Sequence, residues 1–202
     1  MITEIAMGAA EKIDFVSVEE YLRSESDSPV KREYVDGYMH AMAGAGTAHN
    51  RIAGNAHGVL FARLKGSPCL PWGSDMLIRV HTPGRDRFYY PDLSVVCQHN
   101  PQGDGYQDKP VVVLEVLSKS TRRTDLGEKR NAYLSLPSLK AYIVAEQSVA
   151  QVRVWRKLDT GIKREEYQGL DAVVPLPEIG TQIDLAEIYA GVEFGPEPEN
   201  VR

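Results

Sequence analysis

A glutamate lies inside the most apolar strand-like run of the chain. Residues 111–117 read Val-Val-Val-Leu-Glu-Val-Leu, and their apolar side chains would point to both faces, as in a central strand that is covered on each side. An ionised carboxylate left unpaired in such a strand costs several kcal/mol. The fold must therefore supply Glu115 with a cation, a metal ion or a shifted pKa.

A second acid, Asp92, directly precedes another apolar run, residues 93–97. Two acids on neighbouring strands would form an oxygen-lined pocket that suits Mg²⁺ or Mn²⁺, the ions that commonly assist phosphodiester hydrolysis. Two structural explanations compete with this one. Asp92 could merely begin a strand, and Glu115 could form a buried ion pair with Lys119 or Arg130.

Length and composition fit one globular domain, which we place at residues 1–194, followed by a disordered tail at 195–202. The longest apolar runs have the length of strands, and the N-terminus lacks the layout of a signal peptide. We therefore expect no membrane span and a cytoplasmic location. Cys69 and Cys97 lack metal-ligand spacing and are expected to be reduced core residues.

The net charge of −5 argues against tight, non-specific binding to nucleic acid, because such binding depends mostly on phosphate neutralisation by Lys and Arg. A local basic site is still compatible with it. Residues 119–130 hold five basic side chains against two acids, directly after Glu115. This segment is either a phosphate-binding element or an ordinary solvated helix face.

Periodicity and capping signals predict the elements of an α/β (α+β) fold. Helices are expected at 17–24, 47–65, 125–136 and 183–189, and strands at 76–80, 88–96, 111–117 and 139–145. A hairpin is expected at 31–43 around Asp36-Gly37, and peripheral strands at 152–155 and 163–167. The order predicts a mixed sheet flanked by helices, with an added N-terminal hairpin and with both acids on consecutive strands.

Pro91-Asp92 and Glu115, separated by 22 residues, resemble the PD-(D/E)xK nuclease pattern, although Leu117 stands where the lysine is expected. Seven blocks between Val18 and Arg156 further resemble the Uma-type family of restriction endonucleases, in which that lysine is often elsewhere. The blocks are Glu33-Tyr-Val-Asp-Gly37, Ala43-Gly44, His49-Asn50, Ser74-Asp-Met76, Tyr90-Pro-Asp92, Glu115-Val-Leu-Ser118 with Ser120-Thr121, and Asp125-x-x-Glu-Lys129. The resemblance implies a restriction-endonuclease-like core and metal-dependent endonuclease activity on DNA.

The resemblance also implies roles for single residues. Asp92, Glu115 and the main-chain carbonyl of Val116 would bind Mg²⁺ or Mn²⁺. Lys129 would replace the missing lysine and position the attacking water. Glu33 would be a metal ligand or would orient a water molecule bound to the metal, unless it is only a charge on an edge strand.

Lys119 competes with Lys129 for the catalytic role, because it shares a strand face with Glu115 if the strand continues. We expect it to contact a phosphate instead. His49 and Asn50, in the first turn of the long helix, could contact the substrate or a metal-bound water, or merely cap and pack. Asp75 is a further candidate near the site.

Two other functions remain compatible with these residues. One is a binding or scaffolding module that kept the fold without catalysis, which the acidic net charge and Leu117 favour. The other is a phosphoesterase acting on RNA or nucleotides. The hairpin residues Tyr34, Tyr38 and Met39 could form the surface of a homodimer or pack on the sheet.

Overall fold

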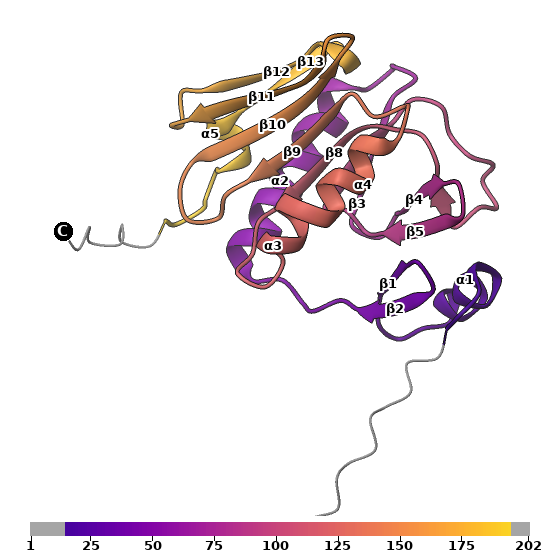
Figure 1. Ribbon diagram of the computed structural model, residues 1–202. Helices are drawn as coiled ribbons and strands as arrows, with labels where there is room; N and C mark the ends of the chain where they lie inside the picture. Colours follow the sequence, from indigo (N-terminus) through magenta and orange to yellow (C-terminus); the bar gives the residue numbers. More distant parts are fainter. Residues whose placement is uncertain (1–14, 195–202) are drawn as a thin grey trace, which may run out of the picture.

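Two large β-sheets and a small hairpin form the fold, which the computed structural model describes for residues 15–194 (Figure 1). The central sheet has the order β11-β10-β9-β8-β6-β3 and the second sheet the order β2-β1-β5-β4-β7. The central strands are β3 (Leu70–Gly73), β6 (Leu93–Val96), β8 (Pro110–Val116), β9 (Ala141–Ala145), β10 (Gln151–Leu158) and β11 (Gly161–Gln168). The second sheet contains β1 (Arg32–Val35), β2 (Tyr38–Ala41), β4 (Leu77–Thr82), β5 (Arg85–Tyr89) and β7 (Tyr106–Gln107), and β12 (Val173–Leu176) pairs with β13 (Thr181–Asp184).

The helices are α1 (Val18–Ser26), α2 (Thr47–Arg63), α3 (Arg122–Thr124), α4 (Arg130–Ser135) and α5 (Leu185–Ile188). A single π-helical turn, η1 (Asp125–Lys129), joins α3 to α4, and a 3₁₀ turn, η2 (Pro177–Ile179), precedes β13. The capping box of Ser17 and Glu20 opens α1 as the sequence predicts. The mixed α+β architecture with helices around a mixed sheet is therefore confirmed.

Strand β8 is central and buried on both faces. It pairs antiparallel with β6 and parallel with β9, and α2 and α4 lie on opposite sides of the sheet (Figure 1). Val112 and Leu114 pack with α2, whereas Val113 and Leu117 pack with α4. Because side chains alternate along a strand, Glu115 points to the α4 side of the sheet.

The predicted early hairpin is present as β1 and β2. Its turn places Asp36 at φ 50° and Gly37 at φ 103°, the left-handed conformations that a two-residue hairpin turn requires. Tyr34 is buried and its ring lies 5.0 Å from that of Tyr21, so it packs in the core rather than offering a dimer surface. Tyr38 is 43% exposed.

The predicted strand 88–96 is divided between the two sheets. β5 pairs with β1 and β4, whereas β6 pairs with β3 and β8. Pro91 lies between them and has no N–H to donate to a ladder, so the chain leaves one sheet there and enters the other. The two predicted acids are nevertheless on neighbouring strands, because β6 and β8 are adjacent.

Two predicted helices begin elsewhere. The helical segment after β8 starts at Arg122 rather than Asp125, so Asp125 lies inside it and is not its cap. The segment 183–189 starts as strand β13, and only Leu185–Ile188 is helical, because Ile183 is held in the pairing with Val174. The predicted tail at 195–202 lies outside the described residues.

Cys69 and Cys97 form a disulfide, which corrects the expectation of two reduced cysteines. Leu70 pairs with Val96 in the antiparallel ladder of β3 and β6, and continuing this register by one residue brings Cys69 opposite Cys97. The spacing in sequence could not show this, because it depends on the pairing of an edge strand, β3, that the sequence pattern did not reveal.

Reducing this disulfide is expected to lower the free energy of unfolding by about 3 kcal/mol, because it closes a loop of 28 residues and restricts the unfolded chain. The melting temperature should fall by roughly 6–12 °C. Thermal unfolding with and without a thiol reductant measures this shift, and the double variant Cys69→Ser/Cys97→Ser is the control that reductant should leave unchanged. Two titratable thiols in the untreated protein would contradict the pairing.

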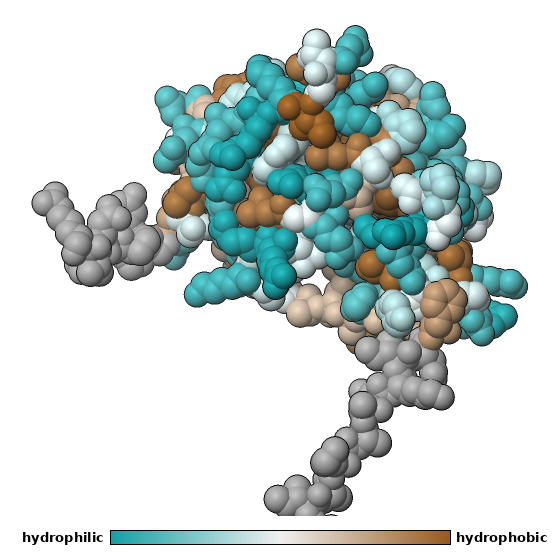
Figure 2. All heavy atoms as spheres, viewed as in Figure 1, coloured by the Kyte–Doolittle hydropathy of each residue, from teal (hydrophilic) through white to brown (hydrophobic). Residues whose placement is uncertain are grey.

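Hydrophilic side chains cover most of the face shown in Figure 2, and the hydrophobic ones lie in separate patches. Within residues 15–194, no helix has both the length and the apolar character needed to cross a bilayer.

Candidate active site

Two hydrogen bonds hold Asp92 and Glu115 side by side, one from the Asp92 N–H to the Glu115 carboxylate and one from the Val116 N–H to the Asp92 carboxylate. The first, to Glu115 Oε2, is 3.1 Å long, and the second, to Asp92 Oδ2, is 2.7 Å long. This follows from the register of β6 and β8, in which Leu93 faces Leu114, so that the next residues along, Asp92 and Glu115, meet at the end of β6. The two acids singled out in the sequence are therefore held side by side.

Lys129 is the cation next to this pair. Its Nζ lies 2.6 Å from Glu33 Oε1 and 3.9 Å from both Glu115 Oε1 and Asp125 Oδ1. Only 5% of Lys129 is exposed. Glu33 also accepts a hydrogen bond from the Tyr90 N–H at 3.2 Å, so it ties Lys129 to the chain segment that leads to Asp92.

Asp125 is a member of this cluster that the sequence analysis missed. The pattern Asp125-x-x-Glu128 is typical of a helix N-terminus, yet Asp125 is 2% exposed and faces Lys129. The π-helical turn Asp125–Lys129 puts both residues on the buried side of the helical segment, and such turns occur frequently at functional sites. The available signal was the four-residue spacing from Lys129, which the capping interpretation obscured.

Three carboxylates, those of Glu33, Glu115 and Asp125, thus lie within 4.0 Å of the Lys129 ammonium group, and Asp92 lies beside Glu115. Burial raises the pKa of Glu115 well above its usual range, and Lys129 only partly opposes this. Burial likewise raises the pKa of Asp125 to about 6. Burial disfavours the charged form of Lys129, but Glu115 and Glu33 outweigh it, so the pKa of Lys129 is raised and the ammonium persists.

His49 and Asn50, two of the weaker candidates, both line the cleft beside the acids. His49 is buried, and its Nε2 lies 3.1 Å from Asp92 Oδ2. Burial alone would lower its pKa, but hydrogen bonding and charge at Asp92 raise it, with a smaller contribution from the Val116 carbonyl. Asn50 is exposed at the cleft and donates to the Ala45 carbonyl at 3.2 Å.

Lys119 and Asp75 do not join the acid cluster. Lys119 is exposed and lines the cleft, so it does not occupy the place next to Glu115 that Lys129 takes. The Asp75 side chain is 92% exposed and pairs with Lys31 at 2.5 Å. Asp75 does not line the cleft itself, although its partner Lys31 does.

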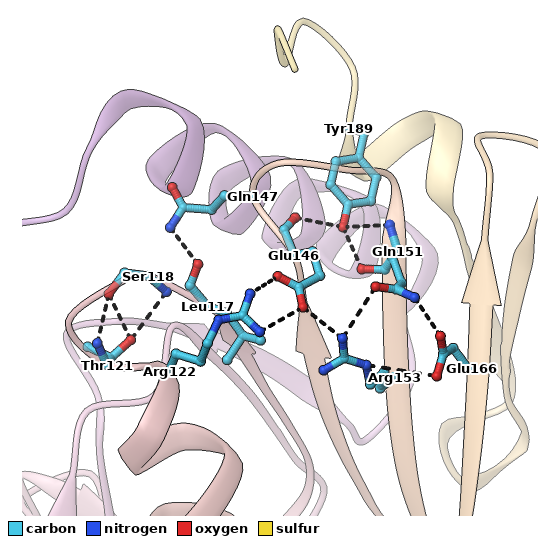
Figure 3. A network of polar contacts seen from close by, with 10 residues as sticks. All are labelled: Leu117, Ser118, Thr121, Arg122, Glu146, Gln147, Gln151, Arg153, Glu166 and Tyr189. Atoms are coloured by element: carbon cyan, nitrogen blue, oxygen red, sulfur yellow. Dashed lines mark hydrogen bonds and ion pairs between the residues drawn. The ribbon is translucent and has the colours of Figure 1, made fainter. Parts of the chain in front are cut away.

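The acid cluster opens into a cleft of about 1030 Å³, lined on its basic side by Lys119 and Arg122. The loop that carries them is fixed locally, since Ser118 and Thr121 hydroxyls lie 2.9 Å apart and the Thr121 N–H donates to Ser118 Oγ at 3.0 Å. Figure 3 shows Arg122 and Arg153 approaching the Glu146 carboxylate from opposite sides. Glu146 thereby fixes the guanidinium group of Arg122 at the cleft wall.

The donor set fits a divalent metal ion. Glu115 Oε1 is buried and accepts no hydrogen bond from protein, since Lys129 Nζ at 3.9 Å is too far to donate one. A buried carboxylate oxygen without a partner is expensive, and a hard cation would satisfy it. Within residues 15–194 no group of three His, Cys, Asp or Glu side chains could hold a metal ion by itself. A site here would therefore combine the carboxylates of Asp92 and Glu115 with the main-chain carbonyl of Val116.

Comparison with known proteins identifies relatives along most of the chain. The profile of the Uma2 family, described as "putative restriction endonuclease", matches residues 18–186. An uncharacterized protein of Synechocystis is 30% identical over 181 residues, which cover 89% of this chain and 94% of that protein. A second uncharacterized Synechocystis protein is 28% identical over 142 residues, covering 69% and 79% respectively.

A solved structure shares the fold. It is described as a putative nuclease belonging to DUF820 from Anabaena variabilis, and the two superpose with a TM-score of 0.68 at 16% identity. The alignment covers 86% of this chain and 97% of that one. At this identity the likeness concerns the fold.

Proposed function

Since the chain belongs to the Uma2 family of nuclease-like proteins, we propose that it hydrolyses DNA phosphodiester bonds with a divalent metal ion, Mg²⁺ or Mn²⁺. One observation carries the proposal. Asp92 and Glu115 are locked together at the floor of a large cleft, with a buried carboxylate oxygen that lacks a partner and with an ammonium group beside it.

Asp92, Glu115 and the Val116 carbonyl would hold the ion. When bound, such an ion lowers the pKa of a water molecule and polarises a phosphate oxygen. Lys129 would orient the attacking water and stabilise negative charge that develops on the phosphate, and its short contact with Glu33 keeps the ammonium in place. Glu33 is then a positioning residue, rather than a metal ligand.

The cleft walls provide contacts for a polyanion. Lys119 and Arg122 face the cleft from the loop after β8, where their charges can pair with phosphates on either side of the scissile bond. This local basic wall reconciles the net charge of −5 with a nucleic acid substrate.

A catalytically silent binding module is the alternative that Leu117 favours. The interior argues against it, because a scaffold would be more stable with apolar residues in place of four buried or partly buried acids and a lysine. A phosphoesterase for RNA or nucleotides would use the same residues, so the choice of substrate in the assay decides between these activities.

Asp92→Asn is expected to reduce metal-dependent cleavage by roughly 10³-fold, because the amide keeps the hydrogen bond from Val116 N–H but loses the charge. Asp75→Asn is the matched control, since it removes the same charge at an exposed position and should leave the rate unchanged. Initial rates on supercoiled plasmid, linear duplex, single-stranded DNA and RNA with Mg²⁺ or Mn²⁺ provide the measurement. Preference for RNA would shift the proposal to a ribonuclease, and equal rates in wild type and Asp92→Asn would refute it.

A further inference from the structure

Glu146 is an acid in the wall of the cleft that we assign to a polyanion. It directly follows strand β9, lines the cleft and is only 6% exposed. By its charge alone, a carboxylate at this place would repel a phosphate backbone. Its contacts point to a different effect, because two arginines share it (Figure 3).

The two arginines leave the cluster around Glu146 positively charged. Arg122 Nη1 donates to Glu146 Oε1 at 3.1 Å and its Nη2 donates to Oε2, whereas Arg153 Nη2 donates to Oε1 at 2.8 Å. Two cations on one carboxylate have an excess of one positive charge. The cluster therefore attracts an anion, although an acid lies at its centre.

Arg122 is the member of this cluster that can meet a ligand. Its side chain is 47% exposed and lines the cleft. A guanidinium group has five N–H donors in one plane, and Glu146 accepts from only one on each Nη atom, so donors remain for a phosphate. Because Glu146 already holds the side chain in one orientation, a ligand does not have to order it.

The support of Glu146 is itself fixed. The buried Tyr189 hydroxyl donates to the Glu146 carbonyl at 2.9 Å. The next residue, Gln147, donates through Nε2 to the Leu117 carbonyl at 2.6 Å. The turn after β9 thus holds both ends of the basic loop, its start at Leu117 and its end at Arg122 (Figure 3).

We propose that Glu146 is a positioning residue for substrate binding, which presents Arg122 to a phosphate of the nucleic acid. A buried acid in the cleft wall would thereby strengthen the binding of a polyanion. The inference rests on the proposed function, because it takes the nucleic acid substrate from there.

Two effects of Glu146 on binding have opposite signs. As a negative charge it repels phosphates, and its neutralisation would lower the KM for the substrate. As the support of Arg122 it promotes binding, and its neutralisation would raise KM. Since two guanidinium groups contact the carboxylate and compensate its charge, the second effect should dominate.

Glu146→Gln keeps the shape of the side chain but removes the charge that holds the two arginines. We expect KM to rise roughly tenfold, because the contact of Arg122 with a phosphate is weakened, while kcat changes by less than about threefold. Initial rates with Mg²⁺ or Mn²⁺ over a range of DNA concentrations measure both constants, at a temperature where unfolding curves show each variant to be folded. An unchanged or lower KM overturns the proposal.

A double-mutant cycle tests whether Glu146 acts through Arg122. Arg122→Ala should raise KM to a similar extent, and adding Glu146→Gln to it should raise KM no further. In a Lys119→Ala background Glu146→Gln should keep its full effect, because the carboxylate holds Arg122 and Arg153 instead. Effects of Glu146→Gln and Arg122→Ala that simply multiply contradict the positioning role.

The salt dependence of binding is a readout that a purely structural role would not change. Each phosphate contact contributes about 0.9 to the slope of log Kd against log salt concentration on duplex DNA. Glu146→Gln should therefore make the slope shallower by about 0.9, measured by fluorescence anisotropy with Ca²⁺ in place of Mg²⁺ to prevent cleavage. An unchanged slope overturns the proposal.

Glu178→Gln is the matched control for these measurements. It neutralises another largely buried acid that pairs with an arginine, Arg156, but it lies outside the cleft. It should leave KM, kcat and the salt slope unchanged even if it lowers the melting temperature. A rise in KM equal to that of Glu146→Gln would assign the effect to lost stability and refute the positioning role.

The outcomes also separate this inference from the function on which it rests. If wild type neither cleaves nor binds DNA or RNA, the proposed function and the role of Glu146 fail together. If wild type cleaves with a metal ion, but Glu146→Gln lowers KM or acts independently of Arg122, the nuclease stands and only the role of Glu146 is refuted.

Discussion

Lys129→Met is expected to lower the free energy of unfolding at pH 8 by about 3–5 kcal/mol in the absence of metal. Lys129 is the ammonium group that Glu33, Glu115 and Asp125 share, and it is almost fully buried. Methionine has a similar volume but leaves these acids without a cation. Because Lys129 is buried among these acids, its loss should affect the fold as well as cleavage.

The loss should depend on pH. Burial raises the pKa of Asp125 from 3.8 to about 6 and that of Glu115 well above 4.5, and removal of Lys129 raises both further. A raised pKa in the folded state gives stability that is present below the unfolded pKa and is lost as pH rises through the folded pKa. The penalty of Lys129→Met should therefore be small near pH 4 and grow toward pH 8.

Thermal and urea unfolding of wild type and Lys129→Met between pH 4 and 8 test this. Lys119→Met is the matched control, because it removes an exposed lysine of the cleft wall and should change stability by less than about 0.5 kcal/mol. A melting temperature of Lys129→Met equal to that of wild type at pH 8 would contradict the shared-cation arrangement. Loss of activity in a Lys129 variant indicates a catalytic role only if these unfolding measurements show that the variant is folded.

The sequence predicted the positions of Asp92 and Glu115 best, because the pairing of two strands determines both. A Glu inside an apolar run and an Asp before the next one were expected on consecutive strands, and the ladder of β6 and β8 brings Asp92 and Glu115 together. The continuous apolar runs predict two central strands that are buried on both faces, and the antiparallel pairing of these strands brings the two acids to the same end. The family resemblance placed Lys129, whose position on a helix no strand pattern determines.

The features that the sequence could not place depend on tertiary contacts. Asp125-x-x-Glu128 satisfies a capping pattern, yet the preceding loop continues the helix back to Arg122 and buries Asp125 in a π-helical turn. The disulfide depends on the pairing of β3 with β6. The division of the predicted strand 88–96 depends on tertiary pairing, since β5 pairs with β1 and β4 whereas β6 pairs with β3 and β8. Pro91 was the local signal for the break.

Glu115→Gln is expected to change activity and stability in opposite directions. Cleavage should fall by roughly 10³-fold or more, because the amide is a poor ligand for a hard cation. The free energy of unfolding at pH 8 without metal should rise by about 1–3 kcal/mol, since a buried carboxylate with an unpartnered oxygen is replaced by a neutral group of nearly the same shape. Lys129 keeps its closest partner, Glu33, at 2.6 Å.

The stability gain has a definite pH dependence. The raised pKa of Glu115 means that the folded protein favours its protonated form, so the wild type is not penalised near pH 4 and loses stability as pH rises through the folded pKa. The advantage of Glu115→Gln should therefore appear above pH 5 and be lost near pH 4. A divalent ion should stabilise wild type and leave the variant unaffected.

Glu146→Gln is the matched comparison for the expected gain in stability of Glu115→Gln. Glu146 is as buried as Glu115, but Arg122 and Arg153 both bind its carboxylate, so neutralising it leaves two guanidinium groups without their partner. Its variant should be less stable at pH 8, by about 1–3 kcal/mol. If Glu115→Gln raises the free energy of unfolding at pH 8 and Glu146→Gln lowers it, Glu115 is an acid that lacks a cation in the metal-free protein, whereas Glu146 is an acid that stabilises the fold. A fall in stability for Glu115→Gln that matches Glu146→Gln would mean that Glu115 is a structural ion-pair partner of Lys129, and the metal site would lose its main support.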